Sequence, residues 1–385
     1  MRRLARLVLG TGAALGLSVW VAPVAGAERP PSGPYGGWGE GHAVFVQTDN
    51  VAGNQIVAYH RNADGTLALA GTYATGGLGG VLNGSVVDHL GSQGSLASDP
   101  THGLLFAVNA GSDSVSVFAV YGDRLRLRQV VSSGGAFPVS IAVHDDLVYV
   151  LNAENGGSVS GYWVTGGRLQ RIWGSTRSLG LTIPTDTTEF THTPGQVAFS
   201  PDGSQLIVTT KANAVGNDVD VFGVGWDGRL SAFPVVNSEP GTVPFAVTFD
   251  RAGHLVIGEA GPSAVVTFRL HRDGTITQID SVPNGQPGLC WVTPAGQYFF
   301  TGNTASNSAS GYQSSANGQL TLLGSTPTDP GTVDGAATAG GRFLYVQTGG
   351  NGIVDEFQVS LDGSLTEIGS VAVSGAAGGE GIVAT

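Results

Sequence analysis

The sequence has one cysteine, one lysine and charged residues at only 12% of its 385 positions. A single cysteine excludes an internal disulfide and every paired-cysteine redox or zinc motif. Cys290 lies in the apolar run Leu289–Val292 and has no basic neighbour. We therefore expect it to be a buried small hydrophobe rather than a reactive thiol.

Motifs for the common catalytic and cofactor chemistries are also missing. The sequence contains no Gly-x-Ser-x-Gly, no His-Glu-x-x-His and no Walker loop. Asp218 and Asp220 are too few carboxylates for a calcium loop. The sequence thus predicts no metal and no cofactor. After the N-terminal region no apolar run reaches about 18 residues, so no integral membrane segment is expected.

The N-terminal residues have the features of a secretory signal. Three arginines precede a short apolar stretch, and Ala25–Ala27 forms a small-x-small cleavage site. We predict that residues 1–27 are a signal peptide that is removed, and that the product is secreted and extracellular. Residues 28–41, which are rich in proline and glycine, are predicted to be a flexible tether.

Basic residues are scarce in the predicted mature chain. Three of the 17 basic residues fall in the signal, which leaves 14 against 29 acidic residues and a net charge of −15. An acidic surface of this kind repels nucleic acid and anionic lipid. We therefore expect a small-molecule ligand, no nucleic-acid partner and a monomer, and a polyanionic substrate is disfavoured.

Glycine, in contrast, is abundant, with 62 residues that follow no three-residue period. Glycine scattered between short apolar runs is typical of many tight turns between strands. The segment Leu96–Val131 shows the repeating unit: two apolar strands around Asp99-Pro100, an alternating strand, a turn at Gly122-Asp123 and a last strand. No stretch after the signal has convincing helical periodicity.

The last turn of each unit measures the repeat. Four of its six spacings are about 43 to 46 residues, and the two near 60 contain the insertions 75–91 and 174–193. Four short strands at this period are the signature of propeller blades. The turn recurs seven times, at Asp64-Gly65, Gly122-Asp123, Gly166-Gly167, Asp227-Gly228, Asp273-Gly274, Asn317-Gly318 and Asp362-Gly363.

These features predict an all-β fold in which residues 42–385 form one seven-bladed β-propeller of four-stranded blades. The first copy begins at His42–Thr48, which corresponds to a second strand without an inner strand before it. The apolar piece Gly381–Ala384 follows the last complete copy. We expect this C-terminal strand to pair into the first blade and close the ring.

Propellers usually bind ligands at one mouth of the central channel, where inner strands begin and second strands end. Lys211, the only lysine, falls at such a position and could stabilise a carboxylate or a developing oxyanion; a salt bridge with Asp218 or Asp220 is the alternative. His192, in the second insertion, and Glu259 are candidates for acid–base catalysis, although either side chain is also compatible with an ordinary loop position. Six further polar residues are predicted to bind substrate: Gln196, Asn152, Glu154, Asn109, Asn303 and Gln347.

Several blade sequences carry a family resemblance. Val197–Leu206, Leu147–Glu154 and Phe343–Gln347 resemble the repeats of the lactonase-type seven-bladed propellers, which include bacterial 6-phosphogluconolactonases and fungal carboxymuconate lactonizing enzymes. The resemblance covers residues 42–385. It implies a His-x-His-like element at the start of a middle inner strand. Here that place reads Thr191–Gln196, with Gln196 where the strand histidine would stand, and glutamine cannot act as a base.

Three functions remain open from the sequence. In the first, a lactonase-like hydrolase or cyclase acts on a non-phosphorylated lactone, with water activated by His192 or an acid and the carbonyl polarised by Lys211. In the second, the protein is a binding propeller for a small molecule, glycan or protein, because Val108–Val117 also resembles YVTN-type repeats. The third is a redox propeller. A buried carboxylate or histidine with a shifted pKa beside Lys211 would favour catalysis.

Overall fold

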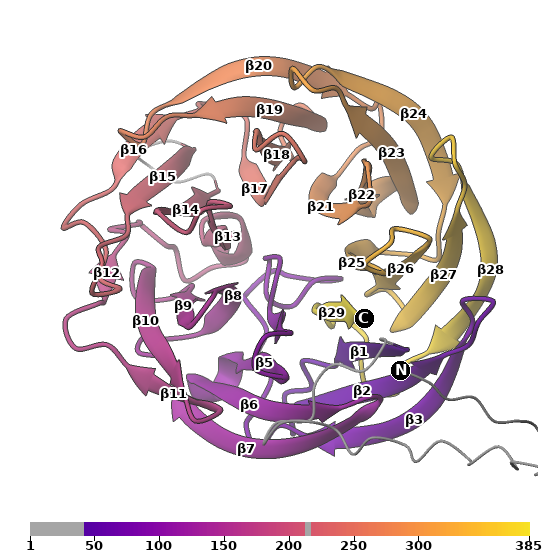
Figure 1. The fold of residues 1–385 in the computed structure, drawn as a ribbon, viewed down its shortest axis with the longest axis horizontal. Helices are drawn as coiled ribbons and strands as arrows, with labels where there is room; N and C mark the ends of the chain where they lie inside the picture. Colours follow the sequence, from indigo (N-terminus) through magenta and orange to yellow (C-terminus); the bar gives the residue numbers. More distant parts are fainter. Residues whose placement is uncertain (1–41, 212–216) are drawn as a thin grey trace, which may run out of the picture. The chain divides into compact units, whose positions relative to one another are not determined.

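The computed structural model describes residues 42–211 and 217–385, which form seven antiparallel sheets around a ring (Figure 1). The predicted signal peptide, residues 1–27, and the tether, residues 28–41, lie outside the described residues. The described chain contains strands and three short 3₁₀ turns, η1 (Ala110–Ser112), η2 (Glu189–Thr191) and η3 (Thr304–Ser306). None of its helices is long and apolar enough to cross a membrane. The predicted seven-bladed all-β propeller is confirmed.

Each sheet runs from an inner strand near the ring axis to an outer strand at the rim. The first sheet contains β29 (Ile382–Ala384), β1 (Ala43–Gln47), β2 (Gln55–Arg61) and β3 (Leu67–Ala74). The second contains β4 (Leu96–Asp99), β5 (Leu104–Asn109), β6 (Ser114–Tyr121) and β7 (Arg124–Ser132). The third contains β8 (Pro138–His144), β9 (Leu147–Asn152), β10 (Ser158–Thr165) and β11 (Arg168–Arg171), with β12 (Arg177–Ser178) beside β10.

The remaining four sheets repeat this order. The fourth sheet contains β13 (Pro194–Phe199), β14 (Gln205–Thr210), β15 (Asp218–Gly223) and β16 (Val235–Ser238), and the fifth contains β17 (Pro244–Phe249), β18 (Leu255–Glu259), β19 (Ala264–Leu270) and β20 (Ile276–Pro283). The sixth contains β21 (Leu289–Ala295), β22 (Tyr298–Asn303), β23 (Ser308–Ser314) and β24 (Leu320–Pro327). The seventh contains β25 (Thr332–Ala337), β26 (Phe343–Thr348), β27 (Ile353–Val359) and β28 (Leu365–Ala372).

The third sheet has a divided outer strand. β11 pairs with the end of β10, and β12 pairs with its beginning at Ser158 and Val159. Residues 172–176 form a turn between the two pieces, and Ile172 and Ser175 of this turn still bond to Gly161 of β10. This blade therefore has five strands where the repeat predicts four. The other six blades have four strands each.

Ring closure follows the prediction. Val44, Phe45 and Val46 of β1 pair with the C-terminal strand β29 in antiparallel register. The Ala43 amide also donates a hydrogen bond to Thr385 Oγ1 at 3.0 Å. One blade therefore contains both the first and the last strands of the propeller, which joins the ring without a disulfide.

The glycine turns that measure the repeat also join neighbouring blades. The buried hydroxyl of Tyr345 donates to the Gly65 carbonyl at 2.7 Å, and that of Tyr149 donates to Gly228 at 2.8 Å. Gly228 has a positive φ of 73°, and a Cβ there would lie 2.6 Å from the Trp163 ring. Glycine is required because the turn packs directly against the preceding blade.

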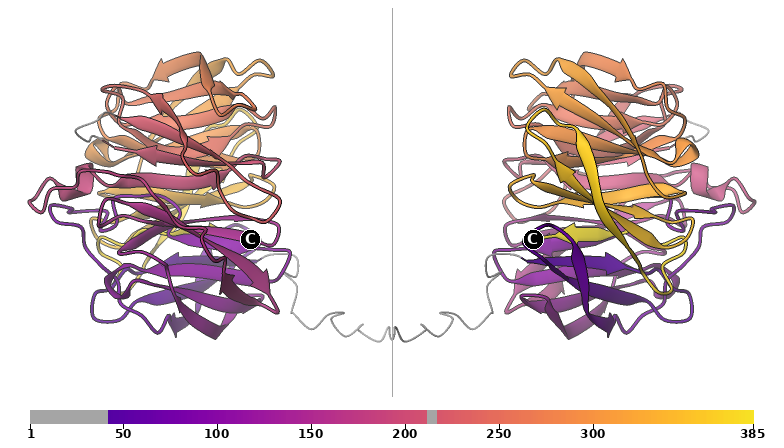
Figure 2. Two further views of the ribbon diagram at one scale, coloured as in Figure 1. Left: turned by 90° about the vertical axis from the view of Figure 1, so that its left-hand side faces the viewer. Right: turned by 90° about the vertical axis from the view of Figure 1, so that its right-hand side faces the viewer.

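The two insertions lie on one face of the ring, where they are seen in purple and pink at the edge of the propeller (Figure 2). They also contact each other. The Asn83 amide donates to the Glu189 carboxylate at 2.8 Å, and its side chain donates to the Thr185 carbonyl at 3.1 Å. The two insertions thus meet on this face of the ring.

Candidate functional site

The first insertion reaches the centre of the ring, as the purple segment between β3 and β4 shows (Figure 1). Gln93 forms two hydrogen bonds of 3.1 Å with the backbone of Val292 in β21, on the far side of the ring. The Gln93 amide donates to Gly195, and the His89 amide donates to Gly378. This segment thus contacts several blades at once and covers the channel mouth, which the sequence had suggested would be lined by strand ends.

Asp88 of this segment is a buried carboxylate, 6% exposed. Its Oδ1 accepts hydrogen bonds from the amides of Leu90 and Gly91, and its Oδ2 accepts one from Ser92, all at 2.9–3.0 Å. A carboxylate has about four lone-pair sites, so one on Oδ2 is left after these bonds. Burial raises the pKa of Asp88 to about 6, although the charge of Lys211 and the amide bonds oppose the rise.

Lys211 follows β14 and is 3% exposed. Its Nζ donates to the Gly91 carbonyl, in the turn that Asp88 holds, and lies 5.3 Å from the centre of the Phe245 ring. Burial lowers the pKa of Lys211 to about 8, while attraction to Asp88 and Cys290 limits the fall. The salt bridge to Asp218 or Asp220 that we considered as the alternative is replaced by this pairing with the first insertion.

Asp88 and Lys211 both face a pocket of about 330 Å³ on the insertion face. A volume near the lower end of small-molecule sites suits a compact ligand. The walls come from both insertions and from the inner strands of the fifth and sixth blades. Lining residues are Gly84, Ser85, Val86, Val87, Asp88, Gly91, Phe190, Thr191, Lys211, Val243, Phe245, Ala260, Gly288, Cys290, Trp291 and Thr304.

Cys290 contributes its side chain to this pocket wall and is partly exposed. Burial raises the pKa of the thiol to about 12, against the opposing effect of the Lys211 charge. A thiol with so high a pKa supplies almost no thiolate near neutral pH. The interpretation of Cys290 as a small apolar side chain agrees with this environment.

A group of buried acids lies beneath the Asp88 turn. Glu380 accepts hydrogen bonds from the Gly94 amide at 2.9 Å and from Ser92 Oγ at 3.2 Å. Its own amide donates to Asp49 at 2.8 Å. Burial raises the pKa values of Asp49 and Asp334 to about 7, and burial together with its acidic neighbours raises that of Glu380 well above its usual range. Glu380 therefore connects the covering segment to the closing blade, and Asp49 binds the Glu380 backbone.

The other predicted catalytic residues lie apart from this pair. His192 caps η2 in the second insertion, and its Nδ1 lies 2.9 Å from the Thr188 carbonyl and 3.0 Å from Thr191 Oγ1. Glu259 ends β18 and is buried, and burial raises its pKa to about 7 with a further contribution from Glu239. Neither lines the pocket, whereas their neighbours Thr191 and Ala260 do.

Most of the predicted substrate-binding side chains form bonds within the scaffold. Asn109 donates to Ser114 and Ser116, and Asn303 donates to Ser308 and Ser310 in the same way. Gln196 accepts from the Val247 amide at 2.6 Å in the next inner strand.

The other three predicted binding residues are placed less uniformly. Asn152 lies 3.4 Å from Ser158, and Gln347 donates to the Gln47 carbonyl at 3.2 Å. Glu154 is partly buried, and its pKa is raised by burial and by the charges of Glu189 and Asp113. None of the six predicted binding residues lines the pocket that contains Asp88 and Lys211.

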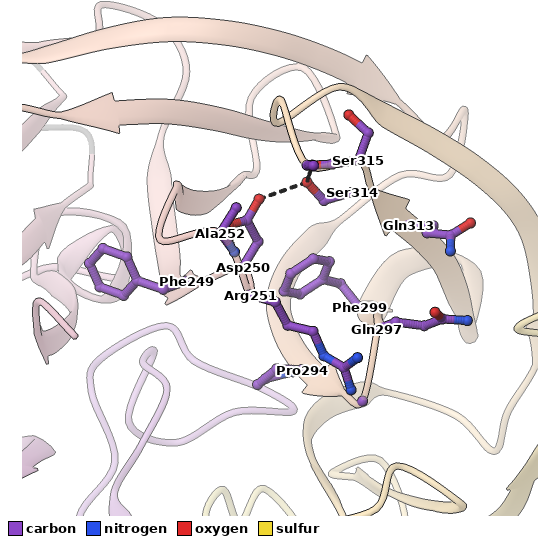
Figure 3. Close-up of a pocket in the computed structure, with 12 residues that line it drawn as sticks. Phe249, Asp250, Arg251, Ala252, Pro294, Gln297, Phe299, Gln313, Ser314 and Ser315 are labelled. Carbon is purple, nitrogen blue, oxygen red and sulfur yellow. Dashed lines mark hydrogen bonds between the residues drawn. The ribbon is translucent and has the colours of Figure 1, made fainter.

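A second pocket, of about 360 Å³, opens between the turns of the fifth and sixth blades (Figure 3). It contains the turns after β17 and β21, at the opposite ends of these strands from the Lys211 pocket. Its central carboxylate, Asp250, accepts from Ser314 Oγ and pairs with His254 Nδ1, both at 2.8 Å. Burial would raise the pKa of Asp250, but the bonds from His254 and Ser314 lower it overall. Through these two bonds Asp250 joins the turn after β17 to the end of β23.

Sequence reasoning identified Lys211 but missed Asp88. The repeat indicates positions on strands and their ends, whereas Asp88 lies in an insertion that no other blade repeats. The one available signal was the insertion's length, since a long loop in a compact repeat is commonly functional. An acid in this insertion was a possible catalytic residue, but the strand pattern could not predict that it would lie near Lys211.

Comparison with known proteins identifies the fold and the family. Residues 95–291 match the family described as "Lactonase, 7-bladed beta-propeller". A search of curated proteins found no match. A proposed 6-phosphogluconolactonase from Bacteroides uniformis superimposes with a TM-score of 0.72 at 18% identity, over 88% of this chain and 98% of that one.

Two further solved structures show the range of the fold. The periplasmic gluconolactonase of Pseudomonas aeruginosa has a TM-score of 0.67 at 19% identity, over 88% of this chain and 98% of its own. The virginiamycin B lyase of Staphylococcus aureus has a TM-score of 0.52 at 13% identity, over 76% and 89%. At these identities the similarity shows the fold alone. The family match covers just over half of the sequence, and the chain belongs to the lactonase family of seven-bladed β-propellers.

Proposed function

We propose that the protein is an exported lactonase that hydrolyses, or in reverse forms, a non-phosphorylated lactone in the pocket between the two insertions. One observation carries the proposal: a buried carboxylate, Asp88, and a buried ammonium, Lys211, face the same small apolar pocket. A buried carboxylate beside a buried cation favours a catalytic over a purely binding channel mouth. Membership of the lactonase family supports the reaction class.

The chemistry assigns one step to each group. Asp88 takes a proton from water through the remaining lone pair of Oδ2, and the hydroxide attacks the lactone carbonyl carbon. The Lys211 ammonium stabilises the oxyanion that forms on the carbonyl oxygen, in a site largely screened from water. Collapse breaks the ring C–O bond, and the leaving alkoxide takes the proton back from Asp88. The products are an alcohol and a carboxylic acid on one chain, and the acid releases its proton to the solvent near neutral pH.

The charge around the pocket supports a substrate without a phosphate. Among the described residues that line the pocket there is no arginine, and Lys211 is the one basic side chain. The charge of Asp88 also acts on the buried acids Asp49, Asp334 and Glu380, so this region is already rich in carboxyl groups. A phosphoryl group carries close to two negative charges near neutral pH and usually requires bidentate arginines or an amide nest.

The test is lactone hydrolysis by the mature chain, followed as acid release in a pH-stat. We expect Lys211→Met to lower kcat/KM by about 100-fold or more, as loss of an oxyanion donor does. His192→Ala is the matched control in the same face, and it should retain activity because its ring bonds within η2. Full activity in Lys211→Met would refute this site.

A binding propeller remains the second candidate, and the three amide bonds to Asp88 favour it. Such bonds also describe a carboxylate whose only task is to shape a turn. Calorimetry separates the two functions. A ligand that binds the wild-type protein and loses affinity in Lys211→Met, but is recovered unchanged, would assign binding without turnover.

Export is part of the proposal and rests on the sequence of residues 1–27 alone. Its basic start, apolar stretch and Ala25–Ala27 site predict cleavage before Glu28. N-terminal sequencing of the protein recovered outside the cells should begin at Glu28. Recovery only inside the cells with residue 1 intact would contradict export while leaving the reaction untouched.

A further inference from the structure

We infer that the pocket takes lactones whose ring carries an apolar alkyl or aryl substituent, rather than polyhydroxylated sugar lactones. This inference rests on the proposed function and names the substrate class of the same site. The walls of the pocket are apolar over most of their area and come from Val86, Val87, Phe190, Val243, Phe245 and Trp291.

The polar side chains that line the pocket already donate their hydrogens within the protein. Thr191 Oγ1 donates to the Thr188 carbonyl and Thr304 Oγ1 to the Thr332 carbonyl, both at 2.7 Å. Ser85 Oγ donates to the Asp88 carbonyl. The Trp291 indole donates to the Ser92 carbonyl at 2.8 Å. None of these four donors is left for a ligand without breaking a bond that the fold uses.

Desolvation decides between the two substrate classes. Each sugar hydroxyl that enters this pocket would lose its water partners and would find none of these four donors free for its oxygen, which disfavours its burial. An alkyl or aryl substituent loses nothing and gains apolar contact with Phe190, Phe245 and Trp291. The pair of Asp88 and Lys211 is then reserved for the ester group, which is the one polar part of such a lactone.

Val243, which lines the pocket, has an unusual backbone conformation. Val243 has a positive φ of 52°, which is rare for a β-branched residue. The carbonyl of Val243 accepts from the Ala260 amide at 3.1 Å, and Phe137 has the same conformation and bond in the third blade. The same turn therefore recurs in two blades, and at Val243 it places the side chain in the pocket lining.

The experiment compares three six-membered lactones by kcat/KM: δ-valerolactone without a substituent, an alkyl-substituted δ-decalactone, and δ-gluconolactone. We expect the alkyl lactone to exceed the unsubstituted one by about tenfold or more, and gluconolactone to fall at least tenfold below it. Gluconolactone equal to or better than the alkyl lactone would overturn the inference and leave lactonase activity standing.

A binding arm keeps the two proposals separate. If no lactone is hydrolysed, the proposed function fails, and calorimetry with the non-hydrolysable six-membered lactams of the same substituents tests the pocket alone. Tighter binding of the alkyl lactam than of the polyhydroxylated lactam supports the apolar preference. Equal binding, or no binding of either, overturns it.

A matched pair of variants tests the wall itself. Val243→Thr keeps the side-chain shape and places a hydroxyl in the pocket, so the preference for the alkyl over the unsubstituted lactone should fall several-fold. Val236→Thr makes the same change on the exposed outer strand β16 and should leave the preference unchanged. An unaltered preference in Val243→Thr would show that this wall does not contact the substituent.

Discussion

The pocket with Asp88 and the pocket with Asp250 are close in size, and each contains one buried aspartate. The environments shift their pKa values in opposite directions. Asp250 accepts from a serine and pairs with a histidine, and the net effect of these bonds lowers its pKa. Asp88 is held mainly by backbone amides beside a desolvated lysine, and burial raises its pKa to about 6. A side-chain network marks a structural brace, whereas a carboxylate left near neutrality beside a cation is suited to chemistry.

The largest expected effect comes from exchanging the two aspartates in turn for asparagine. Asp88→Asn keeps the shape but removes the base, so kcat/KM for lactone hydrolysis should fall by about 100-fold or more. Asp250→Asn, on the other face, should leave kcat/KM within about twofold, because nothing there contacts the substrate. If both variants lose the same factor in kcat/KM, the losses reflect reduced stability of the fold and Asp88 is not the base.

The pH dependence of the reaction sharpens the same contrast. Activity requires Asp88 ionised and Lys211 protonated, so kcat/KM should decrease below pH about 6 and again above about 8. Because the two groups interact, these values belong to the pair. Rates measured from pH 4 to 10 test this. Asp250→Asn should leave both limbs in place, and a profile flat from pH 5 to 9 would contradict the assignment.

The structural role of Asp250 predicts a loss of stability in place of a loss of rate. Asp250→Asn weakens charge-assisted bonds from His254 and Ser314, at about 1–3 kcal/mol. Since the folded-state pKa is lowered, this contribution is present above the unfolded pKa and disappears as pH falls through the folded value. Thermal melting at pH 7 should show a lower Tm, and the difference should shrink towards pH 3. If Asp250→Asn melts at the same Tm as the wild type at pH 7, Asp250 does not stabilise the fold in this way.

The smallest expected effect concerns the acids beneath the Asp88 turn. The folded-state pKa of Asp334 is raised to about 7, chiefly by burial, so its contribution to stability is complete below its unfolded pKa and is lost as pH rises through about 7. Asp334→Asn should therefore raise Tm relative to wild type at pH 8 by a few degrees and change it less at pH 5. A Tm difference that is the same at both pH values would contradict this account.

The fold was predictable because its signals are repeated. Seven glycine-containing turns, five of them Asp-Gly or Asn-Gly, indicated the blade number, and the missing inner strand before Ala43 indicated the closure by β29. The site was predictable only in part. Lys211 occupies a repeat position, but Asp88 meets it through a single crossing of the channel, and no local pattern encodes such a long-range contact.

The asparagines show that a residue repeated between blades can serve the scaffold. Asn109 and Asn303 stand at equivalent strand ends, which suggested a ring of ligand-binding amides. In the structure each is fully buried and bonds the two serines that follow it in the next strand. Their recurrence reflects a hairpin that these two blades stabilise in the same way, and their role in binding substrate stays a prediction.

The pairing of β29 with β1 has a consequence for synthesis of the chain. The apolar strand Ala43–Gln47 is made early, but its inner partner Ile382–Ala384 leaves the ribosome more than three hundred residues later. Until then the first sheet has an open apolar edge, which is a template for pairing with another nascent chain. Without Ile382–Ala384 the edge of β1 would stay unpaired, and the protein would be prone to pair this edge with a strand of another molecule.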